Sequence, residues 1–309
     1  MRRSSAALPL FLLLSSCSLL SSCSVKKYAI NKLGDALAGT GTTFASDDDP
    51  DLIRAAVPFS LKLVESLLAE NPKHEGLLLA AARGFTQYAY AFVQEDADEA
   101  EDTDRARAAA LRARAAKLYV RARNYGLQGL EVKHKDFVAR LKANPKDAVR
   151  ELKKSDVAMM YWAAISWAAA LSASHDLMML PEIPRFEALA DRVVELDEAF
   201  DEGVIHGFLI TYEMSRLNPK PDRIAIAKAH LDRNLALAAD HQAQPYVIYA
   251  ESVLVAQKDK AGFQEMLRQA LRVDINKWPE HRQLNLAMQR RARWLLSRTD
   301  KLFPPPRTQ

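Results

Sequence analysis

LLAENP, residues 67–72, ends one apolar helix pattern just before the next begins, and similar stretches recur later in the chain. The proline matters because its ring cannot continue a helix. VVELD at 193–197 and ALRVD at 270–274 are alike, and LALA at 235–238 is a fainter copy. The last three lie roughly 35–45 residues apart, which is the range for repeats built from helix pairs. The pattern predicts helix pairs that stack and form a concave groove, because one pair cannot bury its apolar face alone.

Composition favours a fold built from helices. Hydrophobic residues make up 49% of the chain and charged residues 27%, while glycine is scarce at 10 residues. Alanine is abundant, and this balance favours packed helices over β-sandwiches. We expect an all-α fold, a helical hairpin array with degenerate tetratricopeptide-like repeats and about 11–13 helices. Residues 46–309 are expected to form this single domain.

The most apolar segment after the N-terminus is VAMMYWAAISWAAAL, residues 157–171, in which Ser166 is the only clearly polar residue. A bilayer-spanning helix needs roughly 20 apolar residues, and this segment is shorter. It therefore predicts a helix buried on all sides. Gly203 and Gly207 are spaced one helical turn apart, which predicts that a neighbouring helix approaches closely there.

The N-terminus has the pattern of a bacterial export signal. Arg2 and Arg3 give a positive start, and a short apolar run interrupted by proline follows. The sequence LSSC then occurs twice, at 14–17 and at 20–23. Leucine, two small residues and cysteine form the lipobox cleaved in bacterial lipoproteins. An ordinary secretory signal is the alternative, but it usually ends in an Ala-x-Ala-like site.

Either lipobox cysteine can accept the lipid, and we favour Cys23 over Cys17. Two lysines follow Cys23 closely, and the sequence before it is still apolar and rich in serine. Residues 1–22 are then the signal peptide, and residues 23–45 are the lipidated N-terminus and its tether. These are the only cysteines in the chain, so the folded domain cannot form a disulfide within itself.

Two charged stretches each have two interpretations. DDDP at 47–50 is either an acidic cation site or a helix start, with Asp49 as the N-cap and Pro50 in the first turn. The helix start is the better interpretation. The acidic run 95–104 precedes a basic, alanine-rich helix over 105–123. That helix predicts a solvated face with intrahelical ion pairs, or else a docking face for an acidic partner or for lipid headgroups.

Aromatic residues supply the candidates for a ligand-binding cleft. Phe85, Tyr88 and Phe92 lie on one helix face, and Gln87 and Tyr90 are polar-tipped groups in an otherwise apolar helix. Ordinary core packing is the simpler interpretation for any one of them. The alternative is an apolar pocket with a few polar groups that orient a ligand. The full candidate set is Phe85, Gln87, Tyr88, Tyr90, Phe92, Trp162, Trp167, His206 and Tyr212.

Motifs for catalysis or for cofactor binding are not found in the sequence. It contains no HExxH, CxxC pair, glycine-rich phosphate loop or G-x-S-x-G elbow. His206 and Glu213 have a helical spacing that suits a general-acid pair, but a polar patch in a groove is the simpler interpretation. The net charge of +4 is too small to indicate nucleic-acid binding. We therefore expect a binding protein with no cofactor, metal or catalytic residue.

Four long segments resemble the TatT component family, periplasmic lipoproteins with tetratricopeptide-like repeats that are associated with TRAP-type solute transporters. The resemblance covers essentially all of residues 23–303. The segments are FASDDDPDLIRAAVPFSLKLVESLLAENP (44–72), GLLLAAARGFTQYAYAFVQ (76–94), ALADRVVELDEAFDEGVIHGFLITYEMSR (188–216) and PEHRQLNLAMQRRARWLL (279–296). The doubled lipobox departs from the family pattern and leaves the mature start open, although the Ser24-Val25 that follows Cys23 matches the family.

The resemblance implies an α-helical repeat protein that assembles as a homotrimer. It also implies a partner, a periplasmic TRAP-type solute-binding protein that delivers ligand to a permease. We expect the chain to be held on a bacterial membrane by its lipid, with the outer membrane favoured. There it docks the solute-binding protein and holds or passes an apolar or amphipathic ligand. The alternative is a structural scaffold lipoprotein that serves envelope assembly and binds only protein.

Overall fold

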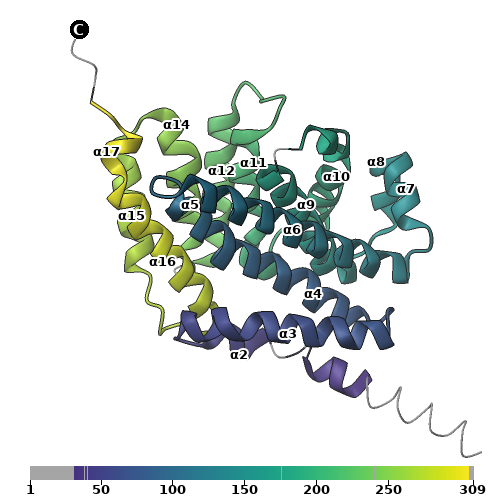
Figure 1. Cartoon of the computed structure of the whole chain (residues 1–309). Helices are drawn as coiled ribbons and strands as arrows, with labels where there is room; N and C mark the ends of the chain where they lie inside the picture. Colours follow the sequence, from purple (N-terminus) through teal and green to yellow (C-terminus); the bar gives the residue numbers. More distant parts are fainter. Residues whose placement is uncertain (1–30, 38, 40, 175, 240, 306–309) are drawn as a thin grey trace, which may run out of the picture.

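The computed structural model describes residues 31–37, 39, 41–174, 176–239 and 241–305, and within them all regular secondary structure is helical. Figure 1 shows the helices stacked side by side, with α15, α16 and α17 at one side of the molecule and α7 and α8 at the other. The expected all-α fold is thus confirmed, while the repeat type remains a prediction. The signal peptide, Cys17 and Cys23 lie outside the described residues.

Helix α3 ends just before the Asn71-Pro72 junction and α9 includes the predicted apolar segment, whereas the basic helix runs on to Lys133. The α-helices are α2 (Gly41–Ser46), α3 (Pro50–Glu70), α4 (Glu75–Tyr88), α5 (Glu95–Ala100), α6 (Arg105–Lys133), α7 (Phe137–Ala143), α8 (Pro145–Ala148), α9 (Val157–Ser174), α10 (Ile183–Asp197), α11 (Val204–Ser215), α12 (Arg223–Ala238), α13 (Gln244–Tyr249), α14 (Val255–Gln257), α15 (Lys260–Arg272), α16 (Arg282–Ser297) and α17 (Thr299–Leu302).

Short segments of other helix types connect or interrupt them. The 3₁₀ turns are η2 (Val149–Glu151), η3 (Lys154–Asp156), η4 (Leu177–Glu182), η5 (Phe200–Gly203) and η7 (Pro279–His281). The π-helical segments are η1 (Ala89–Gln94) and η6 (Ala250–Leu254). Each π segment lies inside a longer helix, and its wider turn changes which face the following side chains occupy.

Helix α3 begins as the DDDP stretch predicts. The Asp49 carboxylate accepts hydrogen bonds of 3.0 Å from the backbone nitrogens of Asp51 and Leu52, and Pro50 is in the first turn. These bonds satisfy two amide groups that would otherwise lack partners at the helix start. The contacts support the helix-start interpretation of these carboxylates.

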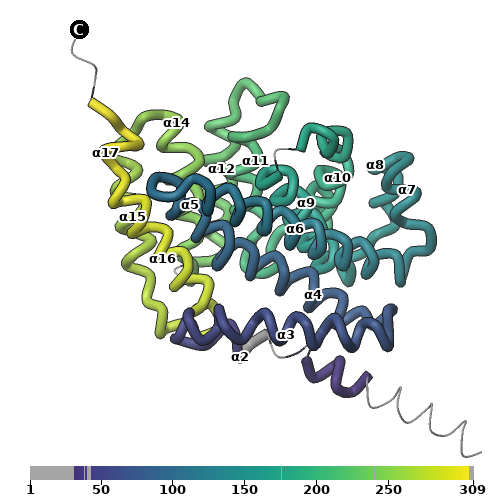
Figure 2. The backbone as a smooth tube through the Cα atoms, viewed as in Figure 1, coloured from purple at the N-terminus to yellow at the C-terminus, as the bar shows by residue number. Residues whose placement is uncertain are grey.

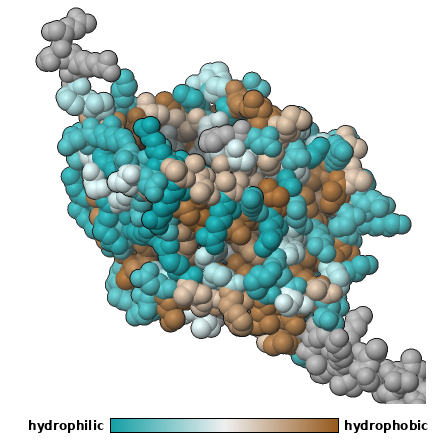
Figure 3. Space-filling model, viewed as in Figure 1, coloured by the Kyte–Doolittle hydropathy of each residue, from teal (hydrophilic) through white to brown (hydrophobic). Residues whose placement is uncertain are grey.

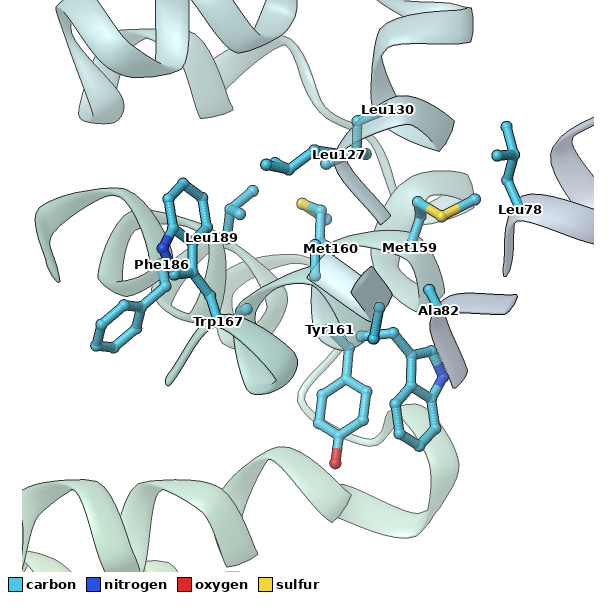
Figure 4. Close-up of a cluster of buried hydrophobic side chains, with 14 of the residues drawn as sticks. Leu78, Ala82, Leu127, Leu130, Met159, Met160, Tyr161, Trp167, Phe186 and Leu189 are labelled. Atoms are coloured by element: carbon cyan, nitrogen blue, oxygen red, sulfur yellow. The ribbon is translucent and has the colours of Figure 1, made fainter. Parts of the chain in front are cut away.

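Helix α9 packs against α4, α6 and α10, and no residue from 157 to 171 is exposed. Figure 4 shows Met159, Met160, Tyr161 and Trp167 of this helix among side chains from α4, α6 and α10. Among the described residues, the helix from Lys154 to Ser174 is the single one long and apolar enough to cross a membrane, and 56% of its apolar window is buried in the fold. Its packing matches the predicted core helix.

The contact between α6 and α9 depends on glycine. A Cβ atom at Gly126 would lie 2.8 Å from the Cβ of Ala163 and 2.9 Å from its Cα, closer than carbon atoms pack. The two backbones therefore meet here with no room for a side chain. The predicted close approach at Gly203 and Gly207 is also confirmed, because a Cβ there would meet Leu237 and Asn234 of α12.

The last long helix returns to the first ones. Figure 2 shows α16 beside α2 and α3, and these elements are in contact. Arg282 of α16 donates a hydrogen bond of 2.7 Å to the carbonyl of Ser46, and Gln283 donates one of 2.8 Å to that of Asp47. The core has two clusters of buried side chains, one from α3 to α11 and one from α11 to α16. The stack is therefore closed by its own C-terminal helices.

Candidate functional site

Helix α4 and the π segment after it carry several of the predicted ligand-binding residues. Phe85 and Tyr88 are buried, whereas Gln87 is exposed. The Phe85 ring stacks on that of Tyr125 with 6.0 Å between centroids. Arg114 donates a hydrogen bond of 3.4 Å to the Tyr88 hydroxyl. Phe85 and Tyr88 thus have packed partners of their own, and Gln87 faces solvent.

Tyr90 and Phe92 follow in η1 and are half-buried. The Arg54 guanidinium lies 5.0 Å from the centroid of the Phe92 ring, a cation–π contact. Tyr90 packs against both core clusters. Burial, together with the nearby Glu95 carboxylate, raises the pKa of the Tyr90 phenol well above its ordinary value. Tyr90 therefore stays neutral and can donate a hydrogen bond at the junction of the two clusters.

The two tryptophans predicted for the cleft lie on α9 within the larger core. Trp162 meets the Tyr161 ring edge-on, with centroids 4.9 Å apart. Trp167 donates a hydrogen bond of 2.8 Å from Nε1 to Glu182, and the Arg123 guanidinium lies 5.1 Å from its ring centroid. The structure thus places them in the same cluster as Phe85 and Tyr88, among closely packed side chains.

His206 and Tyr212 lie on α11, and their polar contacts are with α10, α12 and nearby turns. The Nδ1 atoms of His206 and His230 are 3.0 Å apart. Burial lowers the pKa of both imidazoles, to about 4 for His230. Glu213 pairs instead with Arg216 at 3.0 Å, and Tyr212 donates its hydroxyl to a carboxylate of α10. His206 and Glu213 are therefore not hydrogen-bonded to each other, which favours the polar-patch interpretation.

A group of charges lies where α16 meets α5, and we call it the seam cluster: Glu95, Asp98, Glu251 and Arg291. Glu95 and Arg291 are buried, and the other two are half-buried. Arg291 Nη1 lies 3.5 Å from Glu95 and 3.0 Å from Asp98, and its Nε donates a hydrogen bond of 3.1 Å to Glu251. Glu251 belongs to η6. Tyr90 belongs to η1, and the charges of Glu95, Arg291 and Glu251 contribute to the pKa shift of its phenol. Both π segments thus meet at this cluster, and π turns often occur at functional positions.

Burial governs the charges of the seam cluster. It raises the pKa of Glu95 to about 7, because the attraction of Arg291 does not compensate for lost hydration and the repulsion of Glu251 and Asp98. Burial opposes the charge of Arg291, but the surrounding carboxylates raise its pKa overall. Glu95 Oε2 and Arg291 Nη1 are buried without a well-directed hydrogen bond. The cluster can thus change its charge near neutral pH.

The outer face of α6 is basic and partly open. Arg107, Arg114, Lys117 and Arg121 are exposed along it. An open groove of about 390 Å³ lies on this helix, and it adjoins the buried Phe85 through Arg121, whose guanidinium is 5.2 Å from the Phe85 centroid. The groove is lined by Lys117, Val120, Arg121, Asn124, Tyr125 and Gln128. Figure 3 shows hydrophilic and apolar side chains interspersed across the side of the molecule in view.

The basic residues of α6 make their ion pairs with other elements. Arg112 pairs with Asp98 at 3.3 Å, and Arg123 pairs with Glu182 at 3.1 Å. The expectation of intrahelical pairs is therefore wrong. Helix α6 contains only one acidic residue, Glu131, so its cations find carboxylates on the neighbouring helices. These contacts hold α6 to the rest of the fold and leave other cations on its outer face.

Residues 46–303 match the family described as the TRAP transporter T-component. The chain belongs to this family. A relative, an uncharacterized protein of Treponema pallidum (strain Nichols), is 27% identical over an alignment of 309 positions that covers 93% of this chain and 95% of that protein. The resemblance seen in the four sequence segments is thus confirmed. Membership makes this T-component an accessory part of a TRAP transport system, periplasmic or membrane-associated.

The seam cluster of this T-component was not among the sequence candidates. Glu95 opens an acidic run that suggests a solvated face, and Arg291 lies in the charged stretch QRRAR near the C-terminus. These two residues are almost 200 positions apart, and their spacing gives no indication that they form an ion pair. The one sequence signal is Arg291, which shares a helix face with Met288 and Leu295, whereas the π segment η1 shifts the helix register just before Glu95.

Proposed function

We propose that this T-component is a lipid-anchored accessory protein that docks a periplasmic solute-binding protein of a TRAP system and holds or passes an apolar or amphipathic ligand. The observation that carries the docking part is the exposed basic face of α6. Neither Arg107 nor Lys117 has an ion-pair partner among the described residues. Free cations beside an open groove suit a partner with an acidic surface, because complementary charge speeds encounter and orients the partner.

Small side chains make this face accessible. Between its cations, α6 exposes the alanines 106, 109, 110 and 113, over which another protein surface can approach closely. The groove beside Lys117 and Tyr125 is open, and polar and apolar atoms line it in similar proportion, so it suits a protein segment better than an enclosed small molecule. Docking at α6 is therefore the step that the geometry supports best.

For ligand handling, Tyr90 and Phe92 are the strongest of the sequence candidates. Both are half-buried, and Tyr90 lies between the two core clusters beside the seam cluster. An amphipathic ligand there would meet aromatic walls and a polar end formed by the phenol and nearby charges. Separation of α16 from α5 is the movement that would admit such a ligand, because ion pairs rather than apolar side chains line that contact.

Self-association as a homotrimer and attachment through Cys23 complete the proposal. Leu52 and Phe59 are spaced i and i+7 on the outer face of α3, and their exposed fractions are 56% and 74%. Two large apolar side chains on one exposed helix face suit a contact between copies of the chain. This surface is separate from α6, so a trimer can leave the docking face free.

The docking proposal is tested by titrating the purified protein with the TRAP solute-binding protein of the same organism at low ionic strength. The double variant Arg107→Glu, Lys117→Glu should bind about tenfold more weakly, mainly through a slower association rate. This difference should shrink as salt is added, because exposed charges are screened. The matched control is Lys142→Glu, Lys146→Glu, two exposed lysines of α7 and α8.

The control variant should bind as the wild type does. Equal binding by the α6 variant and the wild type would place the docking face elsewhere. If the wild type binds no solute-binding protein but forms a defined complex with other envelope proteins, the scaffold alternative replaces the transport proposal.

A further inference from the structure

Three residues from separate connections meet beside α12. Glu202 lies in η5, His241 lies in the turn between α12 and α13, and His281 lies in η7. One Glu202 carboxylate oxygen is 2.8 Å from Nδ1 of His241, and the other is 3.2 Å from Nε2 of His281. One ligand atom from each residue lies within 4.8 Å of the others. This group is distinct from the α6 face and from the seam cluster.

Two fully buried asparagines fix the backbone of this group. Asn234 of α12 donates a hydrogen bond of 3.3 Å to the carbonyl of Glu202. Asn285 of α16 donates one of 2.7 Å to the carbonyl of His241. The Trp278 ring lies 3.8 Å from the His241 ring, between centroids, and limits its rotation. The helices thus hold the three side chains in place, as the surroundings of binding sites generally do.

The backbone that presents Glu202 is strained. Asp201, Glu202 and Gly203 have φ angles of 47°, 55° and 78°, three consecutive residues in the left-handed region. Only the glycine adopts this region at little cost, so the two acidic residues are held there by the surrounding structure. Strain of this kind is concentrated at binding and catalytic positions. It directs the Glu202 carboxylate toward the two imidazoles.

Unsatisfied polar atoms next to the group provide a further observation. Gln242 is only 2% exposed, and its amide nitrogen donates a hydrogen bond of 3.1 Å to Glu202. Its amide oxygen, a short distance away, is buried with no hydrogen-bond partner. Buried polar atoms normally have partners, and an ordered water is the usual partner of such an atom. An ion with a coordinated water would supply one.

We propose that Glu202, His241 and His281 bind one divalent transition-metal ion, which ties η5 to the turns that lead into α13 and α16. Two imidazoles and a carboxylate suit such ions, and three protein ligands with one position left for water are typical of Zn²⁺. An ion about 2 Å from each ligand atom requires separations of at most about 4 Å; the three ligand atoms lie within 4.8 Å of one another, so side-chain movements of about 1 Å or less would suffice. The exposed fractions of the three side chains, 28%, 21% and 11%, leave a path for the ion.

The rival explanation is a hydrogen-bonded network in which both imidazoles donate to Glu202. Metal binding differs from it because the ion replaces the protons on the two facing nitrogens. The test uses the purified chain after treatment with a chelator. Zn²⁺ is titrated by calorimetry, and Co²⁺ is added as a spectroscopic probe whose visible absorption reports tetrahedral coordination. We expect one ion per chain and an increase in Tm with Zn²⁺.

The variants Glu202→Gln and His281→Gln should each weaken Zn²⁺ binding at least tenfold and remove the increase in Tm. The matched control is His134→Gln, which alters another imidazole, 3.1 Å from the Asp156 carboxylate, and should leave Zn²⁺ binding unchanged. Circular dichroism in the chelator shows whether each variant folds. X-ray absorption of the wild-type Zn²⁺ complex needs no variant, and it should show two imidazole ligands.

The absence of one-to-one Zn²⁺ binding by the wild type would overturn the proposal, because the network explanation would then suffice. Binding that is equally strong in folded Glu202→Gln and His281→Gln would also overturn it, as would a wild-type absorption spectrum without imidazole ligands. Loss of binding in both variants, with the control intact, would support it.

Discussion

Helices α6 and α9 meet through glycine, alanine and methionine, whereas α5 and α16 meet through arginines and carboxylates. At the first contact the backbones touch at Gly126, and the side chains around it are buried and apolar. At the second, Arg290 pairs with Asp96 at 3.1 Å and with Glu99 at 2.7 Å, and Arg291 pairs within the seam cluster. One contact is made by segments close in sequence, and the other joins segments that are almost 200 residues apart.

The difference separates a permanent contact from one that conditions can change. Apolar burial depends little on pH or salt, whereas ion pairs depend on both. In the seam cluster, ionisation of Glu95 adds a buried carboxylate beside Glu251 and Asp98, so the stability of this contact changes with pH. The stability of the α5–α16 contact is therefore expected to vary with pH and salt, and that of the α6–α9 contact is expected to vary little.

The largest expected effect is at the α9 contact. Trp162→Ala should lower the free energy of unfolding by about 3–5 kcal/mol, because the ring is 8% exposed and its removal leaves a cavity. The matched substitution at the seam is Trp294→Ala, where the half-buried ring stacks between Arg291 and Arg298. It should cost less, since part of that ring already meets solvent. Denaturant unfolding measures both, and equal losses of stability would contradict the difference between the two contacts.

The seam should show its own pH dependence through Glu95. The folded-state pKa of this carboxyl is raised to about 7, so the fold favours its protonated form. Stability should therefore fall as pH rises from about 4.5 to 7 and then level off, by up to about 3 kcal/mol for this group. Glu95→Gln should remove this decline when unfolding is measured across that pH range.

The neighbouring Asp96 is the control, because its pKa shift has the opposite sign. Burial opposes its charge, but hydrogen bonds from Arg54 and Arg290 lower its pKa overall. Asp96 therefore stabilises the fold above its ordinary pKa near 4, and this contribution is lost as pH falls further. Asp96→Asn should change the stability curve only at acid pH. Identical curves for Glu95→Gln and the wild type from pH 4.5 to 7 would show that Glu95 is ionised in the fold.

Local pattern predicted that α9 is buried, but it predicted neither the contact of α9 with α6 nor the seam. The apolar stretch over 157–171 and the Asn-Pro junctions reflect burial and helix ends, which depend on neighbouring residues. The seam depends on pairing between residues 95 and 291, and single-sequence periodicity carries no such information. Two π segments also shift the helix register, so Tyr90 and Glu251 do not lie where a regular helix would place them.

The candidate site shows the same limit. Phe85, Tyr88 and Phe92 were found because they share one helix face. Their surroundings, however, are set by α6 and α9, which contribute Tyr125 and Trp162 to the same cluster. Glu202, His241 and His281 follow one another at intervals of about 40 residues, close to the spacing of the repeat-like stretches. This recurring spacing is a sequence signal. A comparison of the connections between successive helices could have identified the three residues as candidates for one site.

The smallest expected effect tests the backbone contact itself. Gly126→Ala places a Cβ atom 2.9 Å from the Cα of Ala163, so α6 and α9 must move apart. Overpacking of this kind costs about 1–3 kcal/mol, and the better helix propensity of alanine returns about 1 kcal/mol, so a net loss of about 1 kcal/mol is expected.

Gly84→Ala is the control, because its Cβ would meet only the flexible end of the Leu61 side chain. That side chain can turn away, so the small cost of overpacking and the gain in helix propensity should nearly cancel. An equal loss of stability for Gly84→Ala and Gly126→Ala would show that the α6 and α9 backbones move apart as easily as the Leu61 side chain moves. The distinction between a rigid α6–α9 contact and an adjustable α5–α16 contact would then fail.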